Sequence, residues 1–282
     1  MIDSHLHLWD PAVHEYPWLA DEPELNRAFL PSDLDLGGHT IDGFVIVEAG
    51  CRQGQAELAW LEQLASAWPG LRGIVAQVPL EQGSAAAPML IEAAARPLTV
   101  GVRRNVQDER PGFMLAEPML AGVRMLSAHG LPFDACVREH QLKELTALVD
   151  RCPEVTFVLD HLGKPAIAQR RRQPWFDDLA ALARRPNVVA KLSGLTTEAD
   201  HDRWRPVDIA PYLSHALEQF GPDRCMFGSD WPVATLATTY ARWVELVLDV
   251  IAGLPAADRA AILGGTASRV YRLRRNDEEA IA

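Results

Sequence analysis

Short apolar segments alternate along the chain with longer segments in which apolar residues recur at helical spacing. Such alternation is typical of β-α-β units, in which helices connect parallel strands. The apolar segments predict eight strands, over residues 2–7, 43–48, 73–78, 99–103, 133–137, 156–160, 188–192 and 225–228. The helical spacing predicts helices over residues 55–67, 84–96, 115–129, 139–151, 174–185, 207–220 and 238–252, followed by a short helix over 256–263.

Eight strands that alternate with helices can close into a barrel, which typically takes about 250 residues. The chain has 282 residues, so one barrel accounts for nearly all of it. A doubly wound sheet fits less well, because the glycine-rich first turn of that fold is absent. We therefore predict an α/β protein with a single (β/α)8 TIM barrel over residues 1–273 and a charged C-terminal tail over residues 274–282.

The connection after the first strand is unusual. Residues 8–40 contain Trp9, Tyr16, Trp18 and several prolines, but little periodicity. Long irregular segments inside compact domains usually serve a function, and this one is too aromatic for a disordered linker. We predict that this long loop caps the mouth of the barrel.

Charge limits the partners that the protein can have. The formal net charge is −11, which argues against nucleic acid and anionic membrane surfaces as partners. No run approaches about 18 apolar residues, and the N-terminus lacks the pattern of a secretory signal. We therefore expect a cytoplasmic protein without a membrane partner. The sequence gives no indication of the oligomeric state.

Polar residues follow most of the predicted strands. In a β/α barrel the active site lies at the C-terminal ends of the strands, so these residues are the candidates for chemistry. They are His5 and His7, Glu48, Arg103 and Arg104, His161 and Lys164, Lys191 and Ser193, and Asp230. Residues two apart on a strand point to the same side, so His5 and His7 should project together. Adjacent residues point to opposite sides, so only one of Arg103 and Arg104 should reach the mouth.

Several of these residues suit defined chemical roles. The Asp230 carboxylate can bind a metal or take a proton from water as a general base. His161 can bind a metal, hydrogen-bond a substrate oxygen or orient a neighbouring ligand. Lys164 and Arg103 supply positive charge that would stabilise an oxyanion.

Three further candidates each have two interpretations. Lys191 can contact substrate or pair with a buried carboxylate such as Asp160. Trp9 and Trp231 can stack on the apolar face of a sugar or simply fill the end of the barrel.

Six motifs, in order along the chain, resemble the amidohydrolase superfamily. They are DSHLHLWD at residues 3–10, GVRR at 101–104, LDHLGKP at 159–165, KLSGL at 191–195, FGSDWP at 227–232 and GGTA at 264–267. The chain is most similar to the lactonase branch, which includes sugar lactonases such as L-fuconolactonase and the 2-pyrone-4,6-dicarboxylate lactonases. The resemblance spans residues 1–273.

This resemblance implies a barrel that hydrolyses a lactone by activating water. It implies that Asp230 is the general base and that His5, His7 and His161 line the catalytic centre. Arg103 and Lys164 would hold substrate oxygens, with Trp9, Trp231 and Lys191 as further substrate contacts.

The resemblance leaves metal use open. Members with a strongly bound metal usually add a lysine or glutamate ligand on the fourth strand or a histidine on the fifth. Here the fourth strand ends in Arg103, and residues 133–137 of the fifth carry no evident ligand. Lactonases of this branch act without a metal. We therefore expect no required cofactor and an optional divalent metal, zinc, held by His5, His7 and Asp230, with His161 as a further ligand.

The leading hypothesis is a hydrolase of carbohydrate metabolism that opens a sugar (aldono)lactone, a carboxylic ester bond, at the C-terminal face of the barrel. Its partner is then a small-molecule lactone. One alternative is a dicarboxylate lactone hydrolase, which would need several arginines converging on two carboxylates. Another is a metal-dependent decarboxylase of the same superfamily. A barrel that binds a ligand without catalysis is disfavoured, because acidic, basic and cationic groups are all present.

Overall fold

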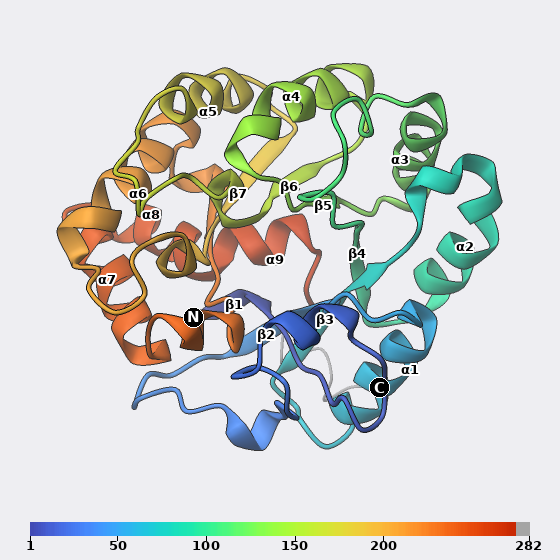
Figure 1. Ribbon diagram of the computed structural model, residues 1–282, viewed down its shortest axis with the longest axis horizontal. Coiled ribbons are helices and arrows are strands. Elements are labelled where there is room, and N and C mark those ends of the chain that lie inside the picture. The colour runs from blue at the N-terminus through green and yellow to red at the C-terminus, as the bar shows by residue number, and fades with distance from the viewer. Residues whose placement is uncertain (275–282) are drawn as a thin grey trace.

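Eight parallel strands form one sheet in the order β1 to β8 in the computed structural model, which describes residues 1–274. The strands are β1 (Ile2–Leu6), β2 (Gly43–Val47), β3 (Leu71–Gln77), β4 (Thr99–Arg103), β5 (Phe133–Ala135), β6 (Phe157–Leu159), β7 (Val188–Leu192) and β8 (Cys225–Phe227). Around them lie α1 (Gly54–Ala65), α2 (Ala87–Ala95), α3 (Glu117–His129), α4 (Leu142–Arg151), α5 (Trp175–Ala183), α6 (Pro206–Phe220) and α7 (Tyr240–Ile251), as Figure 1 shows. The predicted (β/α)8 TIM barrel is confirmed.

The last strand meets the first just beyond their C-terminal ends. The Asp230 amide donates to the His5 carbonyl at 2.8 Å, and the His7 amide donates to the Trp231 carbonyl at 2.7 Å. The buried Asp3 carboxylate also accepts from the Ser229 amide at 2.9 Å. These bonds place the residues that follow β8 directly beside the residues that end β1.

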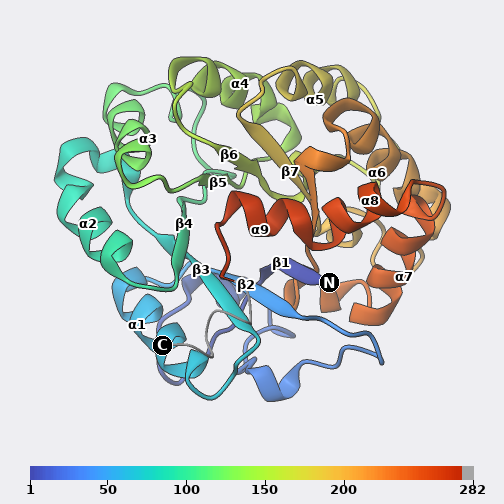
Figure 2. The ribbon, with the colours of Figure 1, turned by 180° about the vertical axis from the view of Figure 1, so that it is seen from behind.

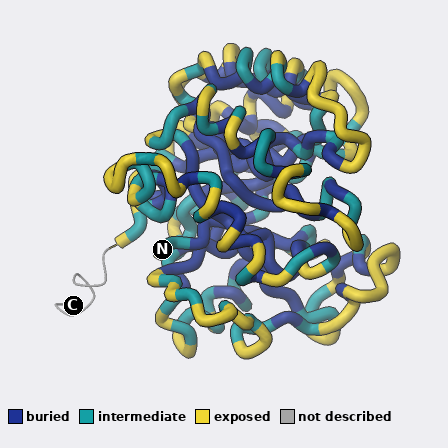
Figure 3. Tube along the Cα trace, turned by 90° about the vertical axis from the view of Figure 1, so that its left-hand side faces the viewer, coloured by how far each residue is buried: buried dark blue, intermediate teal, exposed yellow. Residues whose placement is uncertain are grey.

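Two apolar layers hold the barrel together. The strands are buried on both faces, as expected for a parallel sheet covered by helices. Inside the barrel, Val45, Val75, Val158 and Met226 form a cluster with Tyr271. A larger apolar layer lies between the strands and the amphipathic helices, and Figure 3 shows exposed residues on the outer sides of the helices and in the loops.

The N-terminal end of the barrel is closed by a helix that the sequence pattern did not predict. The short helix expected over residues 256–263 is α8 (Ala256–Ala260), which continues through a π-helical turn into α9 (Thr266–Val270). The chain passes through two adjacent glycines, Gly264 and Gly265, within this π-helical turn. Helix α9 crosses the N-terminal end of the barrel (Figure 2), so this end is sealed and the opposite end carries the loops.

Other boundaries differ by a few residues. The helix expected over 84–96 begins as a 3₁₀ turn, Leu80–Ala86, and only α2 is α-helical. The tail predicted at 274–282 lies outside the described residues except for Arg274. No helix in the described part of the chain is long and apolar enough to cross a membrane.

The connection from β1 to β2 folds over the mouth, as predicted for residues 8–40. It contains two 3₁₀ turns, Pro17–Asp21 and Pro31–Asp33, and no α-helix. Trp9 anchors it, because its indole donates to the Arg27 carbonyl at 2.9 Å and its ring packs edge-on against Trp18 and Phe29.

Candidate functional site

A cavity of about 440 Å³ opens at the C-terminal ends of the strands, beneath the capping loop. Its polar lining includes residues that follow six different strands, namely His7 after β1, Arg103 at the end of β4, Arg138 after β5, His161 after β6, Glu198 after β7 and Asp230 after β8. Its apolar lining comes from the capping loop and the segment after β8, as Trp9, Trp18, Leu25, Val233 and Leu236. The fold thus assembles one site from residues that are more than two hundred positions apart.

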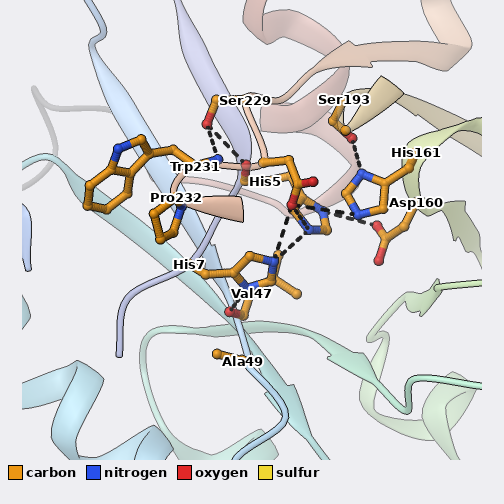
Figure 4. Close-up of polar contacts among 12 residues, drawn as sticks. His5, His7, Val47, Ala49, Asp160, His161, Ser193, Ser229, Trp231 and Pro232 are labelled. Atoms are coloured by element: carbon orange, nitrogen blue, oxygen red, sulfur yellow. Dashed lines mark hydrogen bonds and ion pairs between the residues drawn. The ribbon is translucent and has the colours of Figure 1, made fainter. Parts of the chain in front are cut away.

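Three histidine rings converge on one carboxylate oxygen at the floor of this cavity. The Nε2 atoms of His5, His7 and His161 lie 3.8, 3.6 and 3.8 Å from Asp230 Oδ1. The Nε2 atoms of His5 and His7 are 3.1 Å apart. Figure 4 shows the three rings facing a common point. Sequence reasoning named all four residues, and the structure brings them together.

The outward nitrogen of each ring is held by a partner. His7 Nδ1 donates to the Val47 carbonyl at 2.8 Å, which leaves the lone pair on its inward Nε2. His161 Nδ1 lies 2.9 Å from the Ser193 hydroxyl. Such outer contacts fix both the orientation and the proton position of a catalytic or metal-binding histidine.

His5 has two partners that demand opposite proton positions. Its Nδ1 lies 3.2 Å from Asp160 Oδ1, which can only accept, and 3.1 Å from Lys191 Nζ, which can only donate. A proton on Nδ1 leaves the inward Nε2 as a lone pair, and a proton on Nε2 directs a hydrogen bond toward His7. Asp160 and Lys191 together therefore allow the proton of the His5 ring to lie on either Nδ1 or Nε2.

Burial and neighbouring charge set the protonation of the floor. Burial opposes ionisation of Asp230, yet the surrounding His161, His7 and His5 rings hold the pKa of its carboxyl below the usual range. Burial lowers the pKa of His161 to about 4 and that of His5 well below its ordinary value. At neutral pH the floor thus contains an ionised carboxylate beside the neutral imidazoles of His5 and His161.

Asp230 has a φ of 62° in the tight turn after β8, a conformation that aspartate tolerates better than bulkier residues. Two glycines, Gly194 and Gly228, make room for the cluster of histidines around it. A Cβ added at Gly194, which has a φ of +64°, would lie 2.3 Å from His161 Nδ1 and 2.8 Å from Asp230 Oδ2. A Cβ at Gly228 would lie 2.8 Å from the Cβ of His5. These glycines are part of the site although they carry no functional group.

The structure places Lys191 beneath the cavity rather than in its wall. The side chain is fully buried, and Nζ lies 2.5 Å from Asp134 Oδ2 and 3.0 Å from Asp160 Oδ1. Tyr271 also donates to Asp134, at 2.7 Å. This placement corrects the expectation that Lys191 contacts substrate, because two buried carboxylates already surround its ammonium group. The alternative interpretation, pairing with Asp160, matches the structure.

The two arginines that end β4 diverge, as the strand alternation predicts. Arg103 lines the cavity, with Nε 2.5 Å from Glu48 Oε1 and Nη1 3.5 Å from Asp160 Oδ2. Arg104 points away and pairs with Glu81 and Glu109. Because its guanidinium is held by two carboxylates, Arg103 is a rigid part of the wall.

The two candidate tryptophans have different positions. Trp9 lines the cavity. Trp231 does not, since its ring is 5 % exposed and packs edge-on against Phe29 of the capping loop. The expectation that Trp231 contacts substrate is corrected accordingly, because the loop covers the ring and leaves it filling the barrel end.

Several lining residues were not singled out as site residues from the sequence. They are Asn105, Gln107, Cys136, Arg138, Glu198 and His201. All lie in loops just after β4, β5 or β7, so counting further beyond each strand end would have reached them. Among them, Gln107 accepts from Lys164 Nζ at 2.6 Å and positions that ammonium group at the cavity wall.

The floor also has the donor set of a metal site. Ligand atoms of His5, His161 and Asp230 lie within 4.8 Å of one another, and all three residues are buried. Imidazole nitrogen with carboxylate oxygen suits zinc, and the outer hydrogen bonds provide the supporting shell that such sites need. A second group, Cys136 with Asp160 and His161, meets the same distance criterion. The thiol after β5 is a potential ligand that sequence reasoning did not recognise. Both groups fit a divalent metal by donor type.

Comparison with known proteins identifies the family. The model of the amidohydrolase family matches residues 2–273, and the chain belongs to this family. An L-fucono-1,5-lactonase of Burkholderia multivorans is 37% identical, over 96% of each chain. An L-fucono-1,5-lactonase of Burkholderia ambifaria is 34% identical, over 97% of this chain and 96% of that protein. The expected class of enzyme, a hydrolase of ester bonds, is confirmed at the level of these relatives.

Solved structures agree with this placement. A Burkholderia multivorans amidohydrolase described with bound zinc superposes with a TM-score of 0.88 at 36% identity, covering 97% of this chain and 99% of that one. A 2,6-dihydroxybenzoate decarboxylase, at 15% identity and a TM-score of 0.64, shares the fold alone.

Proposed function

We propose that this protein hydrolyses a sugar (aldono)lactone in the cavity at the C-terminal end of the barrel, with Asp230 as the general base. The observation that carries the proposal is the convergence of His5, His7 and His161 on the Asp230 carboxylate at the floor of a cavity suited to a small molecule. The relatives named L-fucono-1,5-lactonase support the choice of a sugar lactone.

Asp230 takes a proton from a water molecule as that water attacks the lactone carbonyl carbon. A general base must be unprotonated at the working pH, and the lowered pKa of Asp230 meets this requirement. The three histidines hold the carboxylate and the water in place through their inward nitrogens. Because the rings are themselves fixed by Val47 and Ser193, this geometry exists before substrate binds.

Positive charge on the cavity wall stabilises the oxyanion that forms on the carbonyl oxygen. Lys164 and Arg103 both line the cavity, and each is held by a polar partner. Fixed charges of this kind act strongly in a site shielded from water. General base catalysis and oxyanion stabilisation together lower the barrier by roughly 5–9 kcal/mol, which is sufficient for a reactive lactone.

The charge of the cavity favours a neutral polyol over a dicarboxylate. Carboxylates of Glu22 and Asp108 line it together with Asp230. Of its arginines, Arg138 is already paired with Asp108 at 3.1 Å. A dianionic substrate would meet these three carboxylates, whereas a sugar lactone finds donors and acceptors for its hydroxyl groups.

A divalent metal is an optional component in this proposal. His5, His161 and Asp230 would hold it, with His7 beside them. A bound zinc would supply Lewis acidity and lower the pKa of a coordinated water. The zinc described for the similar Burkholderia multivorans amidohydrolase supports this binding. The chain's own groups suffice for the reaction, because base, fixed cations and oriented histidines are all present.

The test is hydrolysis of a panel of aldonolactones by the wild type and by Asp230→Asn, each with and without exhaustive chelation. We expect turnover by the wild type that survives chelation, and a fall in kcat of about 10²–10⁴-fold for the variant with unchanged thermal unfolding. Near-normal activity of Asp230→Asn would refute its role as base. Loss of wild-type activity on chelation, restored by zinc, would show that the metal is required.

A further inference from the structure

Glu198 is a cavity carboxylate that the proposed reaction has not yet used. It ends the 3₁₀ turn Leu195–Glu198 that follows β7, and its side chain lines the same cavity as His161 and Asp230. Its backbone is fixed, because its carbonyl accepts from the Ala168 amide at 2.9 Å. Within residues 1–274, its carboxyl group forms no hydrogen bond or ion pair.

Two of the acidic groups that line this cavity, Glu198 and Asp230, have opposite electrostatic surroundings. Burial raises the pKa of the Glu198 carboxyl, and the Asp230 charge raises it further against the opposing effect of Lys164 and Arg138. The pKa of Asp230 is instead held low by the histidines. Two titratable groups whose environments push their pKa values apart are suited to act as acid and base in one reaction.

Lactone opening needs an acid as well as a base. When the tetrahedral intermediate collapses, the ring oxygen leaves as an alkoxide, which is a poor leaving group unless it receives a proton. The other proton carriers at the mouth have other roles or partners. Lys164, which Gln107 holds in place, already supplies positive charge to the oxyanion in the proposed reaction, and His201 Nε2 lies 3.0 Å from the Thr197 carbonyl. His161 is neutral because of its burial.

We propose that Glu198 is the general acid that protonates the leaving ring oxygen, an inference that rests on the proposed lactonase function. Asp230 removes one proton from water, and the water oxygen bonds to the carbonyl carbon while the carbonyl π pair moves to oxygen. That pair then reforms the double bond, the bond from carbon to the ring oxygen breaks, and the ring oxygen takes the Glu198 proton. The products are a carboxylic acid and a hydroxyl group in one open chain. Asp230 then releases its proton to solvent, and Glu198 regains one.

The test compares Glu198→Gln with the wild type on two kinds of lactone. The ring oxygen of an aldonolactone leaves as an alkoxide and needs the acid. The ring oxygen of dihydrocoumarin leaves as a phenolate, whose conjugate acid has a pKa of about 10, and it needs the acid far less. We expect kcat to fall about 10²–10³-fold on the aldonolactone with little change in KM, and much less on dihydrocoumarin. The alkaline limb of the wild-type kcat profile should disappear, and Glu198→Asp should restore part of the rate.

Glu109→Gln is the matched control. It removes a carboxylate from the loop after β4 that pairs with Arg104 and does not line the cavity, so its kcat should stay at the wild-type value. Thermal unfolding of both variants checks that they fold.

Each outcome has a distinct meaning. If the wild type is active, three results would overturn the acid role and leave the lactonase function standing. They are a Glu198→Gln variant as active as the wild type, an equal loss of rate on both lactones, and an unchanged alkaline limb of the kcat profile. A wild type that opens no aldonolactone would overturn the proposed function and the acid role with it.

Discussion

Gly194 offers a direct test of how tightly the site is packed. It follows β7, and a Cβ at this position would approach His161 Nδ1 to 2.3 Å, where ordinary contacts begin at 3.4 Å. In Gly194→Ala the imidazole or the backbone must therefore move by about 1 Å. The substitution also places alanine at a φ of +64°, which costs roughly 1–2 kcal/mol.

A shift of about 1 Å in a catalytic group can cost about 10²-fold in rate. We therefore expect kcat/KM of Gly194→Ala to fall by about that factor. The backbone cost and the collision together should lower the unfolding free energy by about 2–5 kcal/mol. Initial rates on the best aldonolactone and denaturant unfolding are the two measurements. The imidazole of His161 should also lose its contact with Ser193, which ¹⁵N spectra of the ring nitrogens would detect.

Gly221→Ala is the matched control, because Gly221 has a φ of +77° and no atom within 4 Å of an added Cβ. It removes the collision but places alanine at a φ of 77° and a ψ of 162°, a region essentially restricted to glycine. Gly221→Ala should therefore lose at least as much stability from the backbone as Gly194→Ala does, and yet retain kcat/KM. The reasoning would be refuted by a Gly194→Ala variant as active as the wild type, or by an equal loss of activity in Gly221→Ala.

Two further predictions concern buried charge. Lys191→Met leaves the carboxylates of Asp134 and Asp160 without their shared cation, and we expect it to destabilise the fold by about 3–5 kcal/mol in denaturant unfolding. A loss below about 1 kcal/mol would contradict this account. The second prediction concerns Glu57. Burial and the neighbouring Glu48 raise the pKa of its carboxyl from 4.5 to about 8. Between these two pH values the folded state therefore retains a proton that the unfolded chain releases. Stability should therefore fall as pH rises through this window. The Glu57→Gln side chain stays neutral at every pH. The melting temperature of this variant relative to that of the wild type should therefore rise between about pH 5 and about pH 9. A difference in melting temperature that stays constant over this range would disprove the assignment.

Local patterning was enough to predict most of the fold. The alternation of apolar segments with helical spacing identified all eight strands, because strands buried on both faces read as continuous apolar runs. The pattern did not predict α9, which follows the expected helix over 256–263 through the adjacent glycines Gly264 and Gly265. Tertiary contacts with β1 and β8 outweigh the weak helix propensity of glycine there.

The site was predictable in part for a similar reason. Barrel geometry directs the residues that end each strand to one face, so His5, His7, His161 and Asp230 could be named from their positions alone. The position of a residue along its strand does not reveal which groups its side chain contacts. Lys191 was a plausible substrate contact until the structure placed Asp134 and Asp160 around it.

By itself, then, the sequence determined the barrel, the strand ends with polar residues, and the expectation that only one of Arg103 and Arg104 reaches the mouth, since all of these follow from local spacing. Only the tertiary structure decided which polar groups face the cavity and which are paired beneath it. It buried Trp231 under the capping loop and brought Glu198 into the wall beside Asp230. The physical reason is that protonation, pairing and exposure depend on neighbours distant in sequence, and those neighbours are set by how the loops pack.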